Sequence, residues 1–236
     1  MSQRSLRAAR VCKSFGRQHA LVDVSLAFAP GQVTCIVGPN GAGKTTLLGI
    51  LATLVRPTSG EVLLGEEVLS ATVRWSIGYL GHQPGVYPDL SARQNLRLFA
   101  ALYAIPDAEA RVDFLLERVD LATVRHDLPA RAFSRGMLQR LALARALLHD
   151  PEILLFDEPS SALDPVGVRW LAEELCRERE AGRLVILVTH DLDAAAQVSN
   201  HMVVLRRGRV AADQNSPAGF SAHEVRALYQ EAVRDR

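Results

Sequence analysis

A glycine-rich segment with a lysine and two threonines at its end runs from Gly38 to Thr46 in the stretch "GPNGAGKTT". It directly follows the apolar run "VTCIV", and a helical pattern of apolar residues follows it. Glycines allow backbone N–H groups to approach an anion closely, and the start of a helix adds its positive end. The spacing GxxxxGK[ST] therefore predicts a nucleoside triphosphate site rather than a chance glycine-rich turn.

Within this site we expect Lys44 to contact the β and γ phosphates and the Thr45 hydroxyl to bind Mg²⁺. The chain has 27 Lys and Arg residues, but only Lys13 and Lys44 are lysines. A lysine kept in a chain that otherwise uses arginine indicates chemistry that the broad guanidinium cannot perform. The phosphate-binding residues that the pattern predicts are Gly38, Pro39, Asn40, Gly41, Ala42, Gly43, Lys44, Thr45 and Thr46.

Two adjacent carboxylates, Asp157 and Glu158, follow the apolar run "ILLF". Residues at the carboxyl end of a strand in a doubly wound sheet face the ligand crevice. Asp157 would hold Mg²⁺ there, directly or through water, and Glu158 would orient the attacking water or accept its proton. Alone, such a pair is equally consistent with a solvated turn. The phosphate loop favours the catalytic interpretation.

A sheet is needed to bring these residues together, and short runs rich in Val, Ile and Leu predict its strands. Helical patterns lie between several of the runs, which indicates an α/β fold with a mixed or parallel sheet core. The runs are residues 33–37, 153–156, 184–188 and 202–205.

One stretch between the predicted strands has a different character, because residues 88–149 contain three helix-like segments and no convincing strand. We therefore expect a single domain over residues 1–236, with a sheet core at 1–87 and 150–213 and an inserted helical subdomain at 88–149. A short helical tail is predicted at 217–236, where Ser221 can cap a helix.

The composition limits the classes of protein and partner. A chain of 236 residues with 48% apolar residues can bury a substantial core, and its net charge of +1 does not indicate a nucleic-acid surface. The three cysteines, Cys12, Cys35 and Cys176, form no CxxC pair, which favours a reducing compartment. No run is long enough for a signal peptide or a bilayer span, so we expect a cytoplasmic protein.

The motifs together resemble those of the ATP-binding subunits of ABC transporters, over about residues 6–213. The resemblance implies a P-loop NTPase of the ABC type that hydrolyses ATP with Mg²⁺. Phe15 in "CKSFG" resembles the aromatic residue that stacks on adenine, with a buried strand-edge Phe as the alternative. Gln83 in "GYLGHQ" resembles the glutamine that reaches Mg²⁺ and the water, whereas we interpret His82 beside it as structural. His190, after "LVILVT", resembles the histidine that contacts the γ-phosphate.

The segment "FSRGMLQR", residues 133–140, lies where the family has its signature LSGGQ. Ser134 and Gly136 are kept, whereas Arg135 and Met137 replace a glycine and the glutamine. A helix start that is capped by serine and followed by glycine favours an anion. We therefore expect Ser134 and Gly136 to bind ATP and Met137 to lose a polar contact to the sugar. An ordinary amphipathic helix start is the alternative.

The resemblance also implies partners. The stretch "SALD", Ser161 to Asp164, resembles the loop that crosses to a partner subunit. Two copies, or one copy and a paralogous ATPase subunit, are expected to meet head to tail, with each ATP between the phosphate loop of one chain and the Ser134–Gly136 segment of the other. A separate integral membrane permease is implied, docked beside Gln83 and the inserted helices on the inner face of the cell membrane. No nucleic-acid partner is expected.

Within the family, the sequence most resembles the ATP-binding subunit of the haem exporter of bacterial cytochrome c maturation. Export systems for drugs or polysaccharides are alternatives. A soluble ABC-type ATPase that acts on DNA or ribosomes would more often show tandem nucleotide domains, a long coiled-coil insertion or a basic arm. A phosphate-loop kinase or GTPase would have no use for "FSRGMLQR" or "SALD".

Overall fold

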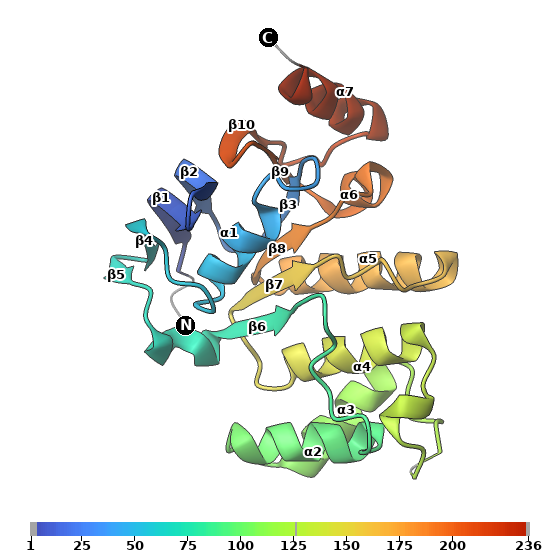
Figure 1. Ribbon diagram of the computed structural model, residues 1–236. Helices are drawn as coiled ribbons and strands as arrows, with labels where there is room; N and C mark the ends of the chain where they lie inside the picture. The colour runs from blue at the N-terminus through green and yellow to red at the C-terminus, as the bar shows by residue number, and fades with distance from the viewer. Residues whose placement is uncertain (1–3, 126, 235–236) are drawn as a thin grey trace.

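The computed structural model describes residues 4–125 and 127–234, and its larger β-sheet has six strands in the order β10–β9–β3–β8–β7–β6 (Figure 1). All neighbouring strands in it are parallel except β10, which is antiparallel to β9. The predicted runs form β3, β7, β8 and β9, and the predicted α/β fold with a mixed sheet is confirmed. The strands are β3 (Gln32–Val37), β6 (Ile77–Leu80), β7 (Ile153–Asp157), β8 (Leu184–Val188), β9 (His201–Arg206) and β10 (Arg209–Asn215).

A smaller antiparallel sheet in the order β2–β1–β4–β5 was not predicted from the sequence. Along β2, buried apolar residues alternate with exposed ones, as is typical of a sheet with one covered face. A search for continuous apolar runs does not detect such strands. They are β1 (Leu6–Phe15), β2 (Gln18–Phe28), β4 (Ser59–Leu64) and β5 (Glu67–Val68).

Helices cover both faces of the larger sheet, whose strands send alternate residues to the two sides. On one side, α1 (Lys44–Leu51) packs between the two sheets, where it buries Leu47, Leu48 and Leu51. The opposite side packs against three helices that follow β7 in the chain. These are α5 (Pro165–Glu180), α6 (Leu192–Val198) and α7 (Ala222–Val233), and α7 begins directly after the cap residue Ser221, as predicted.

The chain between β6 and β7 is helical, and Figure 1 shows its helices grouped at one end of the molecule, below α5. Serines accept hydrogen bonds from the first turns of two of them, α2 and α4, which fixes where these helices begin. A 3₁₀ turn, η1 (Ala71–Ser76), precedes β6, and another, η2 (Ala130–Ala132), precedes α4. The helices are α2 (Ala92–Leu102), α3 (Ala108–Arg118) and α4 (Arg135–Leu147).

A buried ion-pair cluster joins this helical segment to α5. Arg118 of α3 lies 2.6 Å from a carboxylate oxygen of Glu174 and 2.5 Å from one of Glu178. The two glutamate side chains are only 2% and 4% exposed, and each has a second arginine partner, Arg177 for Glu174 and Arg183 for Glu178, so the buried charges form a network. The cluster therefore fixes the position of α3 relative to α5. No helix in residues 4–125 or 127–234 has the length and hydrophobicity that crossing a bilayer requires.

Candidate functional site

The glycine-rich segment forms the loop between β3 and α1, and Lys44 is the first residue of the helix. Gly38 and Gly43 have positive φ angles of 153° and 100°. A Cβ on Gly38 would lie 2.2 Å from the carbonyl oxygen of Leu205, and one on Gly43 would lie 2.5 Å from that of Ala20. Only glycine allows the loop to approach β9 and β2 this closely. The free N–H groups of the first turn of α1 therefore lie at a narrow loop, where an anion can bind.

The Lys44 ammonium lies over this loop and donates hydrogen bonds to the carbonyl oxygens of Gly38 and Pro39, at 2.8 and 3.2 Å. Burial lowers the pKa of Lys44, and the nearby carboxylates of Glu158 and Asp157 oppose that shift. The lysine thus has its charge between the loop and the acidic pair. A phosphate-binding lysine needs this placement.

Asp157 ends β7 beside α1, and the Thr45 hydroxyl lies close enough to its carboxylate to lower the pKa of Asp157. Burial raises this pKa, and the charge of Glu158 adds to the rise, whereas Thr45, His82 and Lys44 lower it. A buried carboxylate in contact with a hydroxyl supplies the hard oxygen ligands that Mg²⁺ prefers. Thr45 and Asp157 therefore fit the ion that the sequence predicts.

Glu158 follows β7 in a left-handed conformation, with a φ of 53°. Its N–H group donates to the carbonyl oxygen of Val188 at 2.9 Å, and its Oε1 lies 2.9 Å from Nδ1 of His190. Its second oxygen, Oε2, is buried and has no hydrogen-bond partner in the described part of the chain. A buried oxygen in that state is open to a hydrogen-bond donor that the described residues do not supply.

The loop that carries Gln83 leaves the sheet next to the acidic pair, because β6 and β7 are parallel neighbours. Gln83 is exposed and forms no hydrogen bond with the residues that the structure describes. Its neighbour His82 is exposed as well, and it lies close enough to Asp157 to lower the pKa of that carboxyl group. Sequence reasoning interpreted His82 as structural, although its position beside Gln83 was a signal for a role at the site.

Phe15, the candidate for stacking on the nucleotide base, is the last residue of β1. It is 54% exposed, so the alternative of a buried strand-edge Phe is wrong. The Lys13 ammonium lies 4.8 Å from the centre of the Phe15 ring and donates to the carbonyl oxygen of Arg56 at 2.8 Å. An exposed aromatic ring offers a surface on which a base can stack.

The segment "FSRG" lies on the helical part of the molecule. The Ser134 hydroxyl accepts a hydrogen bond from the Met137 N–H group at 3.2 Å, so it caps α4 as the sequence predicts. Ser134 and Arg135 are exposed, whereas the Met137 side chain is half-buried against the hydrophobic core. Met137 therefore has a packing role in addition to replacing a polar residue.

This segment has contacts with the "SALD" loop of its own chain. A Cβ on Gly136 would lie 3.8 Å from the carbonyl oxygen of Ala162, and the Gln139 amide donates to the carbonyl oxygen of Pro159 at 2.8 Å. Among the described residues, no hydrogen bond joins Ser134 or Gly136 to residues 38–46. The structure thus brings the phosphate loop, the acidic pair and His190 together, and it leaves Ser134 and Gly136 as a separate group.

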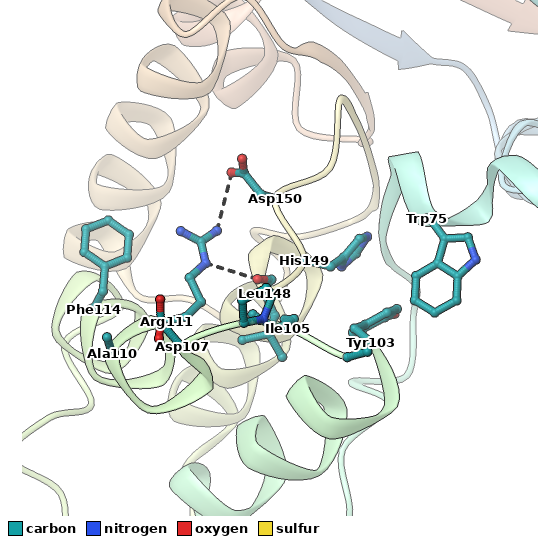
Figure 2. Close-up of a pocket in the computed structure, with 12 residues that line it drawn as sticks. Trp75, Tyr103, Ile105, Asp107, Ala110, Arg111, Phe114, Leu148, His149 and Asp150 are labelled. Carbon is teal, nitrogen blue, oxygen red and sulfur yellow. Dashed lines mark hydrogen bonds and ion pairs between the residues drawn. The ribbon is translucent and has the colours of Figure 1, made fainter. Parts of the chain in front are cut away.

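A groove of about 620 Å³ lies on the side of the helical segment, between η1, α3 and the turn after α4 (Figure 2). The rings of Tyr103 and His149 stack with centroids 4.3 Å apart, and Trp75 packs edge-on against Tyr103 at 5.4 Å. Trp75 is 56% exposed and Phe114 is 49% exposed. This groove was not predicted, and its exposed aromatic rings are typical of a surface for a protein partner.

The comparisons with known proteins agree with this geometry. Residues 21–161 match a family model described as ABC transporter. The daunorubicin resistance ATP-binding protein DrrA3 of Streptomyces coeruleorubidus is 40% identical over 206 residues, which cover 85% of this chain and 65%, just under two thirds, of that protein. The Nod factor export ATP-binding protein I of Cupriavidus metallidurans is 37% identical over 242 residues, which cover 98% of this chain and 79% of that protein.

Solved structures give the same result. The ATP-binding subunit of an ABC transporter superposes with a TM-score of 0.87 at 28% identity, over 97% of this chain and 99% of that chain. The ATP-binding cassette MJ0796, a dimer in a post-hydrolysis state bound to ADP and Pi, superposes with a TM-score of 0.81 at 28% identity, over 89% of this chain and 98% of that chain. The fold and site define a phosphate-loop ATPase. The chain belongs to the ABC transporter family, and the resemblance found in the sequence is confirmed at that level.

Proposed function

We propose that this chain is the ATP-hydrolysing subunit of a transporter and that it binds Mg²⁺ and ATP between segment 38–46 and the acidic pair. The observation that carries the proposal is the contact of Thr45 with Asp157 beside Lys44, because it unites the two predicted motifs in one site. When bound, Mg²⁺ supplies charge neutralisation at the phosphate oxygens. Lys44 and the loop N–H groups would hold the phosphates, and Phe15 would stack on the base.

In the proposed reaction, Glu158 orients a water molecule and accepts its proton through a carboxylate oxygen. His190 donates a hydrogen bond to the carboxylate or to the γ-phosphate, and its 2.9 Å distance from Glu158 supports a role in positioning that residue. Gln83 would reach the metal and the water from the loop after β6. Its exposure next to the end of β7 supports this placement.

We further propose that two ATPase subunits, either two copies of this chain or one copy and a paralogous subunit, meet head to tail. Each ATP would contact Ser134 and Gly136 of the opposite chain, as well as the phosphate loop of its own. The capped start of α4 supports this, because Ser134 is exposed and a helix start favours an anion. The dimeric structure of the similar cassette MJ0796 is in agreement with it.

The proposed permease partner is an integral membrane protein that docks in the aromatic groove beside the inserted helices. This would hold the chain at the inner face of the cell membrane. The exposed rings of Trp75 and Phe114 support a protein occupant, since large apolar surfaces of this kind are otherwise unfavourable in water.

Export is the proposed direction of transport, and it is supported by relatives that are named for drug resistance and Nod factor export. A drug or a Nod factor is therefore a better supported cargo than haem, the narrower proposal from the sequence. Uptake is the second candidate, because the glycine betaine uptake protein YehX of Escherichia coli is 37% identical over 212 residues.

The proposal is tested with the variant Glu158→Gln. It should bind ATP and accumulate as a dimer, while its rate of hydrolysis falls by at least about a hundredfold, since a general base contributes about 10²- to 10⁴-fold. Glu173→Gln, at an exposed carboxylate of α5, serves as the control and should keep the parental rate. A Glu158→Gln protein that hydrolyses ATP at the parental rate would disprove the assigned role.

A further inference from the structure

The loop that carries Gln83 is held in place mainly by side chains that lie outside it in the sequence. Residues 81–86 form no hydrogen bond within the part of the chain that the structure describes. The far end of the loop is fixed by the buried side chain of Asn95 in α2, which accepts from the Tyr87 N–H group at 2.7 Å and donates to its carbonyl oxygen at 3.0 Å. A segment without hydrogen bonds of its own depends on such anchors for a defined position.

A second anchor, Arg145 in the last turn of α4, lies at the near end of the loop. Its Nη2 donates to the carbonyl oxygen of Tyr79 in β6 at 2.8 Å. A Cβ on Gly85 would lie 3.4 Å from Cζ and Nη2 of Arg145, so the guanidinium lies directly against the backbone of Gly85. The guanidinium carbon is also 5.4 Å from the centre of the Phe99 ring in α2. Figure 1 shows the chain leaving β6 and passing α4 on its way to α2, in agreement with these contacts.

Packing alone does not explain an arginine at this position. The Nε of Arg145 is buried and has no hydrogen-bond partner among the described residues, which opposes folding. Burial lowers the pKa of Arg145, so its charge is also unfavourable there. An apolar side chain of similar length would fill the space without these costs. The position therefore favours a role that needs the planar, hydrogen-bonding head group.

We propose that Arg145 is a positioning residue that holds the Gln83 loop against α4 and so places Gln83 beside the acidic pair. The loop then follows α4, the helix whose first turn carries Ser134 and Gly136. Movement of that helix would be transmitted to Gln83 by a direct contact. This inference rests on the proposed role of Gln83 in hydrolysis, although the anchoring of the loop can be measured independently.

The phenol of Tyr79 lies within the electrostatic influence of both groups. Burial raises the pKa of Tyr79, the carboxylate of Asp157 raises it further, and Arg145 lowers it. Arg145 also donates a hydrogen bond to the Tyr79 carbonyl oxygen, so a displacement of its head group would change the surroundings of a residue that lies near the acidic pair.

The first test measures hydrogen–deuterium exchange of the intact protein in residues 77–87, where the hydrogen-bonded amides are those of β6 and of Tyr87. Arg145→Met, which keeps the length but removes the head group, should increase exchange in this segment. Arg140→Met is the matched control, because Arg140 is on the same helix, donates to the carbonyl oxygen of Val119 at 3.1 Å and lies 4.6 Å from the Trp170 ring, away from the loop. Equal exchange in residues 77–87 of the parent and Arg145→Met would overturn the proposal.

The second test is kinetic and uses Gln83→Ala as a background. Arg145→Met should lower kcat by about tenfold to a hundredfold, the effect of a misplaced group, and change the KM for ATP by less than about twofold. In the Gln83→Ala background it should lower kcat by no more than about twofold, since the group that it positions is already absent. An equal loss in both backgrounds would overturn the proposal.

Two further outcomes separate this inference from the proposed function. If Gln83→Ala retains the parental kcat, the role of Gln83 in hydrolysis is wrong, and the exchange experiment alone decides whether Arg145 anchors the loop. Arg145→Lys, which can still donate to the Tyr79 carbonyl oxygen, should restore part of kcat and of the exchange protection. If Arg145→Met does not fold, Arg145→Lys is compared with Arg140→Lys in the same measurements, and identical exchange in the two would count against the proposal.

Discussion

Nδ1 of His190 lies 2.9 Å from Oε1 of Glu158, so the two side chains are in contact at the ends of two neighbouring parallel strands. Glu158 directly follows β7, and His190 is the second residue after β8. Both strands are buried throughout. The His190 side chain is 70% exposed, whereas that of Glu158 is 21% exposed. The histidine is thus placed to hold the more buried carboxylate in one orientation.

His190→Ala should therefore slow ATP hydrolysis through Glu158. We expect kcat to fall by about a hundredfold with little change in the affinity for ATP, and the double variant with Glu158→Gln should be no slower than Glu158→Gln alone. Steady-state hydrolysis and nucleotide-binding titrations measure the two quantities, and His223→Ala, at an exposed position of α7, is the control. Fully additive losses in the double variant would show that His190 acts independently of Glu158.

Asp157→Asn should remove magnesium-dependent hydrolysis and at the same time stabilise the free protein. Burial and Glu158 raise the pKa of Asp157 above its usual value in the folded chain. The folded state therefore binds the proton more tightly than the unfolded state, and stability falls as the pH rises from the ordinary pKa through the raised one. At pH 7 the ionised carboxylate destabilises the fold.

The measurement is thermal unfolding without nucleotide across a series of pH values. The Tm of Asp157→Asn should exceed that of the parent at pH 7, and the difference should disappear below the ordinary pKa of an aspartic acid, where both states are protonated. A lower Tm for Asp157→Asn at pH 7 would contradict the direction of the shift.

Gly38→Ala and Gly41→Ala should differ although both glycines have positive φ angles. A Cβ on Gly38 would lie 2.2 Å from a backbone oxygen of β9, whereas nothing lies within 4 Å of one on Gly41. We expect Gly38→Ala to lower the free energy of unfolding by more than about 2 kcal/mol and Gly41→Ala by about 1 kcal/mol. Chemical denaturation of both variants checks the order, and ATP affinity should fall further in Gly38→Ala.

Shared sites between two chains can be tested by mixing inactive variants. Ser134→Arg and Lys44→Ala should each be inactive alone, because both composite sites of each dimer are damaged. In an equal mixture, half of the dimers would contain one intact site, so activity should return to about a quarter of the parental value. A mixture of Lys44→Ala with the double variant Lys44→Ala, Ser134→Arg contains no intact site and should remain inactive. Dimer formation is monitored in each mixture, and a lack of recovery in the first one would contradict head-to-tail sharing.

Continuous apolar runs and glycine spacing made much of this protein predictable. The runs at 33–37 and 153–156 became strands of the same sheet, because strands buried on both sides require such residues. The cap residues Ser134 and Ser221 were predictable, since a hydroxyl before a helical pattern acts within one turn of the chain. The smaller sheet was missed because its longer strands, β1 and β2, mix buried and exposed residues, and β1 also pairs with β4, which is far away in the sequence.

Local chemistry is therefore what the sequence by itself determined: a phosphate-binding loop, an acidic pair at a strand end and a capped helix start, each set by residues close together in the chain. Only the tertiary structure decided which of these meet. Parallel pairing of β7 with β8 brings His190 to Glu158, the packing of α1 brings Thr45 to Asp157, and α4 brings Arg145 to the Gln83 loop. Such contacts depend on sheet order and helix packing, which spacing along one chain does not encode.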